Sequence, residues 1–208
     1  MSARKIEIVD RGTGGVVEAL LHSACSPSQL VATQALWGPA RMKAIEELLA
    51  SGHPPETIPQ HWHWDWNRKS ANLDLLAYRC AGIEHGGQMQ GLVMMIAARH
   101  SATLAPDQGK PLIYIDYIES APWNLKPLTN APRFGGIGTL LFEAAVRHSQ
   151  AEGFHGRVGL HSLSQAERFY TRNCGMTMSD PDPAKQGLRY FESTRGQAEA
   201  FLSKDGRR

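Results

Sequence analysis

A glycine-rich hexapeptide has the residue types and the position of an anion-binding loop. It reads Arg133-Phe-Gly-Gly-Ile-Gly138 and stands between a strongly strand-forming and a strongly helix-forming segment. The first backbone N–H groups of a helix have no intrahelical partner, and the helix dipole adds partial positive charge there. Glycines let the main chain approach a bulky anion closely. The hexapeptide therefore predicts a phosphate or pyrophosphate site, at which Arg133 adds a charged contact.

The spacing of these glycines excludes two common phosphate-binding motifs. No Gly-Lys-Ser/Thr follows, so the hexapeptide is not a Walker A loop, and the spacing does not fit G-x-G-x-x-G either. The alternative is a plain glycine turn. The strand before the hexapeptide and the helix after it favour the anion site.

The hexapeptide fits the pattern R-x-x-G-x-G and resembles the acetyl-CoA loop of the GCN5-related N-acetyltransferases, the GNAT superfamily. Downstream, Ala166-Glu-Arg-Phe-Tyr-Thr-Arg-Asn-Cys-Gly-Met176 resembles the A-x-x-F/L-Y pattern of that family with its following Gly-Phe. The order of predicted elements matches over nearly the whole chain, and residues 112–176 carry the specific motifs. The chain departs from the pattern in the wide spacing of Pro122 and Arg133, and in Leu163, where the family usually has Asn.

The resemblance implies one GNAT-like domain over residues 1–208 that transfers an acetyl group from acetyl-CoA to an amine by direct attack. A non-catalytic acyl-CoA-binding module on the same fold is the alternative, because a fold does not prove an activity. The resemblance implies that acetyl-CoA lies across two splayed parallel strands. Backbone groups would bind its pyrophosphate at Phe134, Gly135, Gly136, Ile137, Gly138 and Thr139, and its pantetheine arm at Ile118, Ser120 and Ala121.

Tyr170 matches the family tyrosine that protonates the thiolate leaving group, and its alternative is aromatic packing beside Phe169. A tyrosine pKa near 10 suits an acid that stays protonated at pH 7. Asp116 and Glu119 are candidate bases on one predicted strand, where their spacing of three residues puts them on opposite faces. Glu119 lies nearer the end of the strand and is the preferred base; a water relay is the alternative. We interpret Cys174 as a packed residue rather than a nucleophile.

A second unusual segment is His61-Trp-His-Trp-Asp-Trp66. In an extended chain His61, His63 and Asp65 would share one face, which could ligate zinc or iron in a metal hydrolase. No metal is expected, because Trp66 replaces the final histidine of the metallo-β-lactamase pattern that this segment otherwise matches. Either the tryptophans pack in the core while Asp65 caps a neighbouring segment, or the segment lines an acceptor pocket. The candidate pocket residues are Trp64, Trp66, Trp123 and Asn124.

The elements that would position these residues follow from hydrophobic periodicity. Strands are predicted at 5–10, 73–83, 89–97, 112–120, 156–163 and 188–192, with a hairpin turn at 84–87. Helices are predicted at 16–23, 28–50 with a break at Gly38-Pro39, 139–152, 165–173 and after Gly196. Strands 112–120 and 156–163 flank a helix and should be parallel. The fold class is α/β: a mixed, mostly antiparallel sheet with a splayed parallel pair and helices on both faces.

Composition narrows the classes of partner. The chain has 208 residues, 22 Lys+Arg against 20 Asp+Glu, and 42% hydrophobic residues. This near-neutral balance argues against nucleic acid as a partner, and the longest apolar stretch is far too short to cross a membrane. The absence of an apolar leader and the three scattered cysteines predict a cytoplasmic protein. The resemblance implies an amine-bearing small molecule or a protein amine as the acceptor, and it leaves a homodimer open.

Overall fold

The computed structural model describes residues 3–205. Within them, nine strands form one sheet, hydrogen-bonded in the order β6-β1-β2-β3-β4-β5-β7-β9-β8. The sheet is mixed and mostly antiparallel, which confirms the predicted α/β class. The strands are β1 (Ala3–Asp10), β2 (Val16–His22), β3 (Tyr78–His85), β4 (Gln88–Ile96), β5 (Ile113–Ser120), β6 (Phe134–Gly135), β7 (Val158–Ser162), β8 (Thr177–Asp182) and β9 (Leu188–Ser193).

The chain divides into two compact units. The first comprises the residues up to Leu76 together with Cys80–Leu92 and Ile118–Gly138. The second comprises Ala77–Arg79, Val93–Tyr117 and the residues from Thr139 onward. The helices are α1 (Pro27–Ala50), α2 (Trp66–Ser70), α3 (Ile137–Ala151), α4 (Glu167–Arg172) and α5 (Arg195–Asp205), with short 3-10 turns η1 (Pro55–Thr57), η2 (Ala71–Asp74), η3 (Pro122–Asn124), η4 (Ser164–Ala166) and η5 (Pro183–Lys185).

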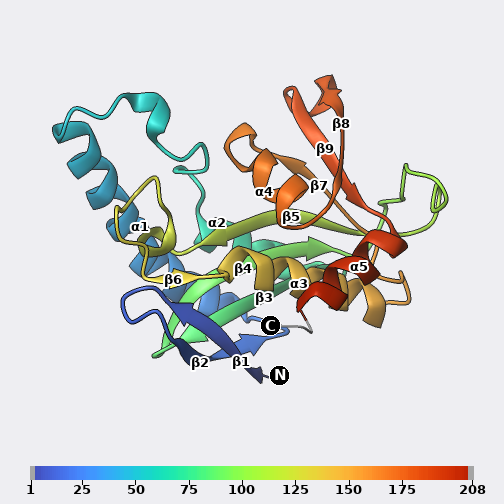
Figure 1. The fold of residues 1–208 in the computed structure, drawn as a ribbon, viewed down its shortest axis with the longest axis horizontal. Helices are drawn as coiled ribbons and strands as arrows, with labels where there is room; N and C mark the ends of the chain where they lie inside the picture. The colour runs from blue at the N-terminus through green and yellow to red at the C-terminus, as the bar shows by residue number, and fades with distance from the viewer. Residues whose placement is uncertain (1–2, 206–208) are drawn as a thin grey trace. The chain divides into compact units, whose positions relative to one another are not determined.

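In the first unit, β1 and β2 form an antiparallel hairpin, blue in Figure 1. The helix predicted over 16–23 is therefore wrong. Oδ1 of Asp10 accepts the backbone N–H of Gly12 at 2.8 Å, and Gly14 has φ +74°, so the chain reverses tightly after β1. The reversal places Val16 opposite Val9, where β-branched residues suit a strand. The paired strand overrides the weaker helical pattern.

Helix α1 begins with a capping box, in which Ser26 and Gln29 each bond the backbone of the other. The predicted break at Gly38-Pro39 is wrong, because α1 runs through Pro39 to Ala50. Side chains on both sides of the proline fix the helix: Nε1 of Trp37 donates to the carbonyl of Met89 at 3.2 Å, and Arg41 is buried. Tertiary contacts therefore hold a helix that propensity alone would interrupt.

The predicted hairpin at 84–87 is confirmed. Gly86 and Gly87 have φ of +59° and +74° between β3 and β4. Two successive residues with positive φ define the type I′ turn that fits the twist of antiparallel strands. The strand predicted from 73 begins only at Tyr78, because Ala71–Asp74 form a 3-10 turn.

In the second unit, β5 and β7 are parallel, as predicted. Their pairing consists of Ile113 with Val158 and Tyr114 with Gly159, although β5 continues to Ser120 and β7 to Ser162. On its other edge, β7 pairs with β9 along its whole length, from Val158 to Ser162. The parallel pair therefore separates after two residue pairs, which is the splay that the sequence resemblance implies.

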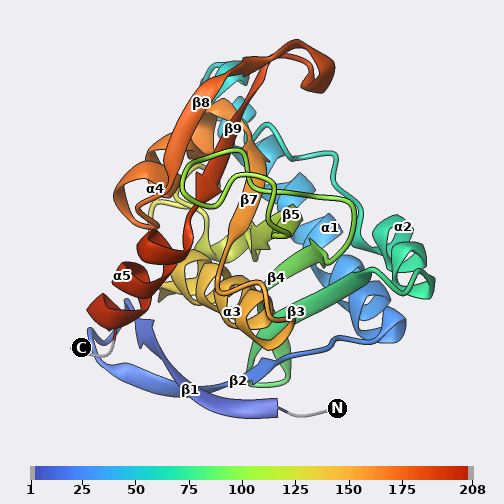
Figure 2. The ribbon, with the colours of Figure 1, turned by 90° about the vertical axis from the view of Figure 1, so that its right-hand side faces the viewer.

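The β8–β9 ribbon lies beside α4 in the second unit and is orange to red in Figure 2. Strand β8 has no counterpart in the sequence prediction, because its Ser-Asp-Pro-Asp composition disfavours a strand. Its pairing with β9 contains an irregularity between Met178 and Pro181, where a proline is tolerated. The predicted helix 165–173 forms as a 3-10 turn followed by α4.

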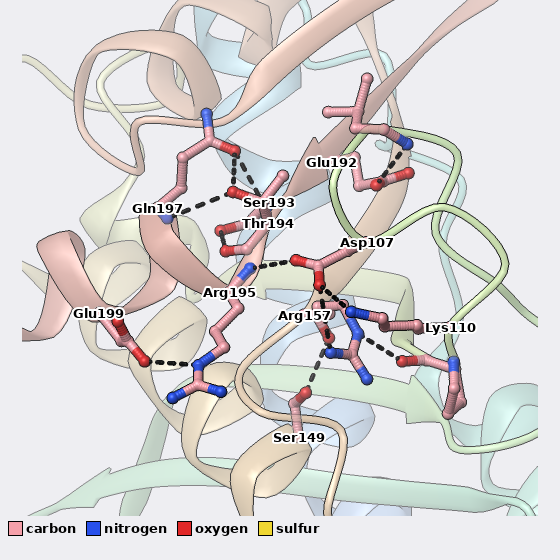
Figure 3. A network of polar contacts seen from close by, with 12 residues as sticks. Asp107, Lys110, Ser149, Arg157, Glu192, Ser193, Thr194, Arg195, Gln197 and Glu199 are labelled. Atoms are coloured by element: carbon pink, nitrogen blue, oxygen red, sulfur yellow. Dashed lines mark hydrogen bonds and ion pairs between the residues drawn. The ribbon is translucent and has the colours of Figure 1, made fainter.

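A buried polar network ties the loop before β5 to α5 and β7 (Figure 3). The Asp107 carboxylate accepts the backbone N–H of Arg195 at 2.9 Å and lies 3.6 Å from the Arg157 guanidinium. These donors hold the pKa of Asp107 below its usual range, the Arg195 amide most of all. Buried charges are stable when they are paired in this way. We interpret the network as structural.

Among residues 3–205, no helix combines the length and apolar character that crossing a membrane requires.

Candidate functional site

The glycine loop is held by backbone pairing on both sides. Strand β6 pairs with the end of β1, placing Gly135 opposite Val9. The Arg11 amide donates to the carbonyl of Arg133 at 2.9 Å, and the Arg133 amide donates to the carbonyl of Trp123 at 3.0 Å. The loop is thus the third strand of the β1–β2 ribbon, a role that its glycines do not reveal in the sequence.

Asn124 fixes the position at which the loop turns into α3. Its Oδ1 accepts the backbone N–H of Phe134 at 3.0 Å. The Phe134 amide therefore has a protein partner before any ligand binds. Gly136 has φ +81° and α3 begins at Ile137, so the amides from Gly136 to Thr139 are those that a helix N-terminus leaves without an intrahelical acceptor.

Two arginines from segments far apart in the sequence border this loop. Arg133 is exposed, with its guanidinium 4.9 Å from the ring centre of Phe134. Nε of Arg11 lies 3.0 Å from the point that a Cβ on Gly135 would occupy, so the absence of that Cβ lets the guanidinium lie against the backbone. A pocket of about 540 Å³ has both arginines in its wall, together with Asp10, Gly12, Asn130, Ala131 and Pro132.

The structure thus adds Arg11 to the predicted loop residues. The Asp10 carboxylate in the same wall also bonds the N–H groups of Gly12 and Thr13 in the β1–β2 turn. Sequence reasoning missed Arg11 because it lies more than a hundred residues before the hexapeptide, in a turn without a motif. The pairing of β1 with β6 brings it to the loop.

Trp123 and Asn124, predicted as acceptor-pocket residues, converge on Gln90. Nε1 of Trp123 donates to Oε1 of Gln90 at 2.8 Å, and Nδ2 of Asn124 donates to the same oxygen at 3.1 Å. Gln90 is 1% exposed and its carbonyl accepts the Ala121 amide at 2.9 Å. Gln90 therefore connects β4 to the segment after β5, and through Asn124 to the glycine loop. Nothing in the sequence marked it.

The residues predicted to hold the pantetheine arm lie at the end of β5. Ile118 and Ser120 are half-buried, whereas Ala121 is buried and its amide is already bonded to Gln90. The β5 pairing with β7 ends at Tyr114, so Ile118 and Ser120 lie beyond the paired part of that edge. A strand edge without a partner strand offers backbone groups to an extended ligand.

Glu119, the predicted base, is enclosed by donors from two other segments. Nη2 of Arg41 donates to its Oε1 at 2.7 Å, and Nε1 of Trp66 donates to its Oε2 at 2.7 Å. The Glu119 side chain is 0% exposed. Burial raises its pKa to about 7, against the opposing effects of Arg41 and Trp66. The carboxylate is therefore poised to titrate near neutrality but has no direct access to solvent.

The segment His61–Trp66 forms a turn followed by the first residue of α2, so it is not the extended chain considered from the sequence. Asp65 caps α2 by accepting the N–H groups of Asn67 and Arg68, as one of the two interpretations predicted. Trp66 is 0% exposed and meets Trp37 edge-to-face with ring centres 6.4 Å apart. Trp66 is thus a core residue bonded to Glu119.

Trp64, also a candidate pocket residue, is only half-buried. The Lys69 ammonium lies 5.2 Å from the ring centre of Trp64. The His61 ring also packs against the Trp64 ring, with the two ring centres 5.2 Å apart. Nη1 of Arg41 donates to the carbonyls of Trp62 and Trp64 at 2.9 and 2.7 Å. Residues 3–205 contain no group of three or more His, Cys, Asp or Glu side chains placed to hold a metal ion.

Tyr170 belongs to the second unit, where α4 places it at 4% exposure. Its ring packs against those of Phe169 and Phe191, with centres 5.1 and 5.6 Å away. Burial raises its pKa well above the usual range, and Cys174 adds to this effect. The phenol therefore keeps its proton at neutral pH, as a general acid must. Cys174 is buried and its thiol pKa is raised by burial, which makes it a poor nucleophile.

Comparisons with known proteins identify the fold. No family model matches the chain, and a search of curated proteins found no match. Among solved structures, the PaiA N-acetyltransferase of Thermoplasma acidophilum in complex with coenzyme A matches with a TM-score of 0.52 and 11% identity, over 86% of this chain and 99% of that one. The GNAT domain of PAT from S. lividans matches with a TM-score of 0.54 and 12% identity, over 91% and 96% of the two chains. A bacterial toxin matches with a TM-score of 0.55 and 14% identity, over 70% and 83%.

These likenesses confirm the predicted fold: the protein has the fold of the GNAT acetyltransferases.

Proposed function

We propose that this protein is an N-acetyltransferase that moves the acetyl group of acetyl-CoA to an amine. The observation that carries the proposal is the glycine loop, in which the Gly136–Thr139 amides begin α3 while Arg11 and Arg133 share one pocket wall. Backbone N–H groups at a helix start combined with guanidinium groups suit a pyrophosphate. The GNAT-type fold supports the same assignment.

Catalysis requires a deprotonated amine, support for the tetrahedral intermediate and a proton for the leaving thiolate. We assign the last task to Tyr170, whose raised pKa keeps the phenol protonated. The half-buried backbone at Ile118 and Ser120 would hold the pantetheine arm. We keep Glu119 as the final proton acceptor, since burial brings its pKa to about 7.

Calorimetry with CoA tests the donor site. Wild-type protein should bind CoA, and Arg133→Glu should weaken binding by roughly 10-fold or more, because a charge-assisted contact contributes about 1.5–3 kcal/mol. Lys5→Ala is the matched control, because Lys5 is an exposed cation on β1 already paired with Glu18. No binding of CoA at millimolar concentration would refute the proposal.

Thiol release from acetyl-CoA with a panel of primary amines tests the reaction. Tyr170→Phe should lower kcat by ~10²–10⁴-fold, the usual contribution of a general acid, and should leave CoA affinity unchanged. Full activity of Tyr170→Phe would remove Tyr170 from the mechanism.

One observation favours a second candidate, a non-catalytic acyl-CoA-binding module: the Glu119 side chain is 0% exposed and both its oxygens are bonded. CoA binding without thiol release from any amine in the panel would favour this module.

We further propose a cytoplasmic location, with an amine-bearing small molecule or protein amine as the partner. The three free, buried cysteines, Cys25, Cys80 and Cys174, suit a reducing compartment. A homodimer stays a prediction, which sedimentation equilibrium would test.

A further inference from the structure

The enclosed carboxylate of Glu119 needs a path for protons. Arg41 and Trp66, which bond its two oxygens, are 2% and 0% exposed. Neither side chain can exchange a proton at neutral pH, because a guanidinium stays protonated and an indole N–H only donates. A base acting through Glu119 therefore requires another titratable group that touches the carboxylate and also reaches the surface.

His61 meets both conditions. Its Nε2 lies 3.6 Å from Oε1 of Glu119, and its side chain is 18% exposed. That nitrogen is itself buried and has no hydrogen-bond partner. A buried polar atom without a partner is rare and calls for an explanation. The distance is slightly too long for a hydrogen bond, and catalytic contacts of this kind often shorten only when substrate binds.

The surroundings of His61 keep the imidazole neutral. Burial lowers its pKa to about 4, and the nearby charges of Arg41 and His63 add to the effect. Lys69 is a further cation beside Glu119, and Trp64 packs on the imidazole ring. A neutral imidazole carries one N–H and one free nitrogen, so it can take a proton at one atom while releasing one at the other.

We propose that His61 is the proton relay between the acceptor amine and Glu119. As the lone pair of the neutral amine forms the C–N bond, the nitrogen loses one proton to Nδ1 of His61 and keeps the N–H electron pair, while Nε2 of His61 passes its proton to Oε1 of Glu119. The C–S bond then breaks with its electron pair on sulfur, and the thiolate takes the proton of Tyr170. The Glu119 proton then returns to Nε2 of His61 while Nδ1 releases its proton to water, which restores Nε2–H and the carboxylate with a net loss of one proton. Tyr170 regains its proton from water. The relay rests on the proposed function and gives the His/Trp segment a role in it.

Activity with acetyl-CoA and the amine panel tests the relay. His61→Gln and Glu119→Gln should each lower kcat by ~10²–10³-fold, within the usual range for general base catalysis, with CoA affinity unchanged. Groups acting in series are non-additive, so the double variant should be no slower than the slower single variant. His53→Gln is the control, because His53 is an exposed histidine eight residues before His61; it should retain wild-type activity.

A spectroscopic measurement on the same full-length protein needs no acceptor. Nitrogen-15 correlation spectra should show His61 neutral at pH 6 with the proton on Nε2, and Glu119→Gln should shift the ring nitrogens away from that tautomer. Unchanged His61 nitrogens in Glu119→Gln, or a double variant slowed by the product of the single effects, would overturn the relay. Thiol release by His61→Gln at the wild-type rate would overturn the relay but leave the proposed acetyltransferase function intact. Absence of CoA binding would instead remove the proposed function, and the relay with it.

Discussion

Nη2 of Arg41 lies 2.7 Å from Oε1 of Glu119, and the two side chains are 2% and 0% exposed. This contact joins α1 to β5 across a separation of 78 residues. The same guanidinium bonds the carbonyls of Trp62 and Trp64. Arg41 therefore holds both the candidate base and the segment that carries its proposed relay.

Arg41→Ala should destabilise the protein by about 3–5 kcal/mol, because removing one partner of a buried pair leaves an uncompensated charge. Urea unfolding measures the change. Lys43→Ala is the control on the same helix, where the exposed Lys43–Glu47 pair is 3.8 Å apart; it should change stability by less than about 0.5 kcal/mol. A loss below about 1 kcal/mol for Arg41→Ala would mean that Glu119 finds another partner.

Glu119→Gln should change how stability depends on pH. The pKa of Glu119 rises from 4.5 to about 7 on folding, so between these values the folded protein keeps a proton that the unfolded chain has lost. The stability gained from Glu119 is therefore complete below pH 4.5 and is lost as the pH rises through about 7. The wild type should lose stability relative to Glu119→Gln over this window. Parallel curves would contradict the raised pKa.

His61→Gln should give the opposite slope. The pKa of His61 falls from 6.5 to about 4 on folding. Between these pH values the unfolded chain binds a proton at His61 and the folded protein does not. The contribution of His61 is fully present above pH 6.5 and is lost as the pH falls through about 4. Thermal unfolding should show that acidification across this range destabilises wild type more than His61→Gln. Parallel curves for wild type and His61→Gln would contradict the lowered pKa of His61.

Arg11→Ala should weaken CoA binding by roughly 10-fold, the effect of losing one charge-assisted contact to phosphate. The CoA affinity of this variant should also depend less steeply on salt concentration, because one fewer cation attracts the phosphates and dissolved salt screens that attraction. Isothermal calorimetry at two salt concentrations measures both effects. Unchanged affinity in Arg11→Ala would limit the phosphate site to Arg133 and the loop amides.

Gly136→Ala tests the backbone of the loop. Gly136 has φ +81° and its Cβ would meet nothing within 4 Å, so the substitution acts through backbone strain alone. The expected loss is about 1–2 kcal/mol. Gly196→Ala is the matched control in α5, also in open space but without a positive φ, and should stabilise by up to about 1 kcal/mol. Equal changes in the free energy of unfolding for the two substitutions would contradict backbone strain at position 136.

Local sequence patterns were sufficient to predict the central strand, the hairpin turn and the helix after the glycine loop. The Leu112–Ser120 segment, the Gly-Gly turn and the helix after Gly138 appear nearly where the sequence predicts them, because β-branched residues, paired positive-φ glycines and a long apolar helix face each favour one structure. Val16–His22 forms a strand and not the predicted helix, because its residues suit either structure and the pairing with β1 decides between them. Helix α1 continues through Pro39, where a break was predicted, because Trp37 and Arg41 anchor the helix on both sides of the proline.

The candidate site divides in the same way. The sequence by itself predicted a glycine loop at the start of a helix, a helix that carries Tyr170, and the α/β class, because all three follow from patterns along the chain. Only the tertiary structure decided that Arg11 joins the loop, that Gln90 supports Asn124, and that Arg41 and His61 meet Glu119. Such contacts join residues far apart in sequence, and their energies depend on burial, which no local pattern records.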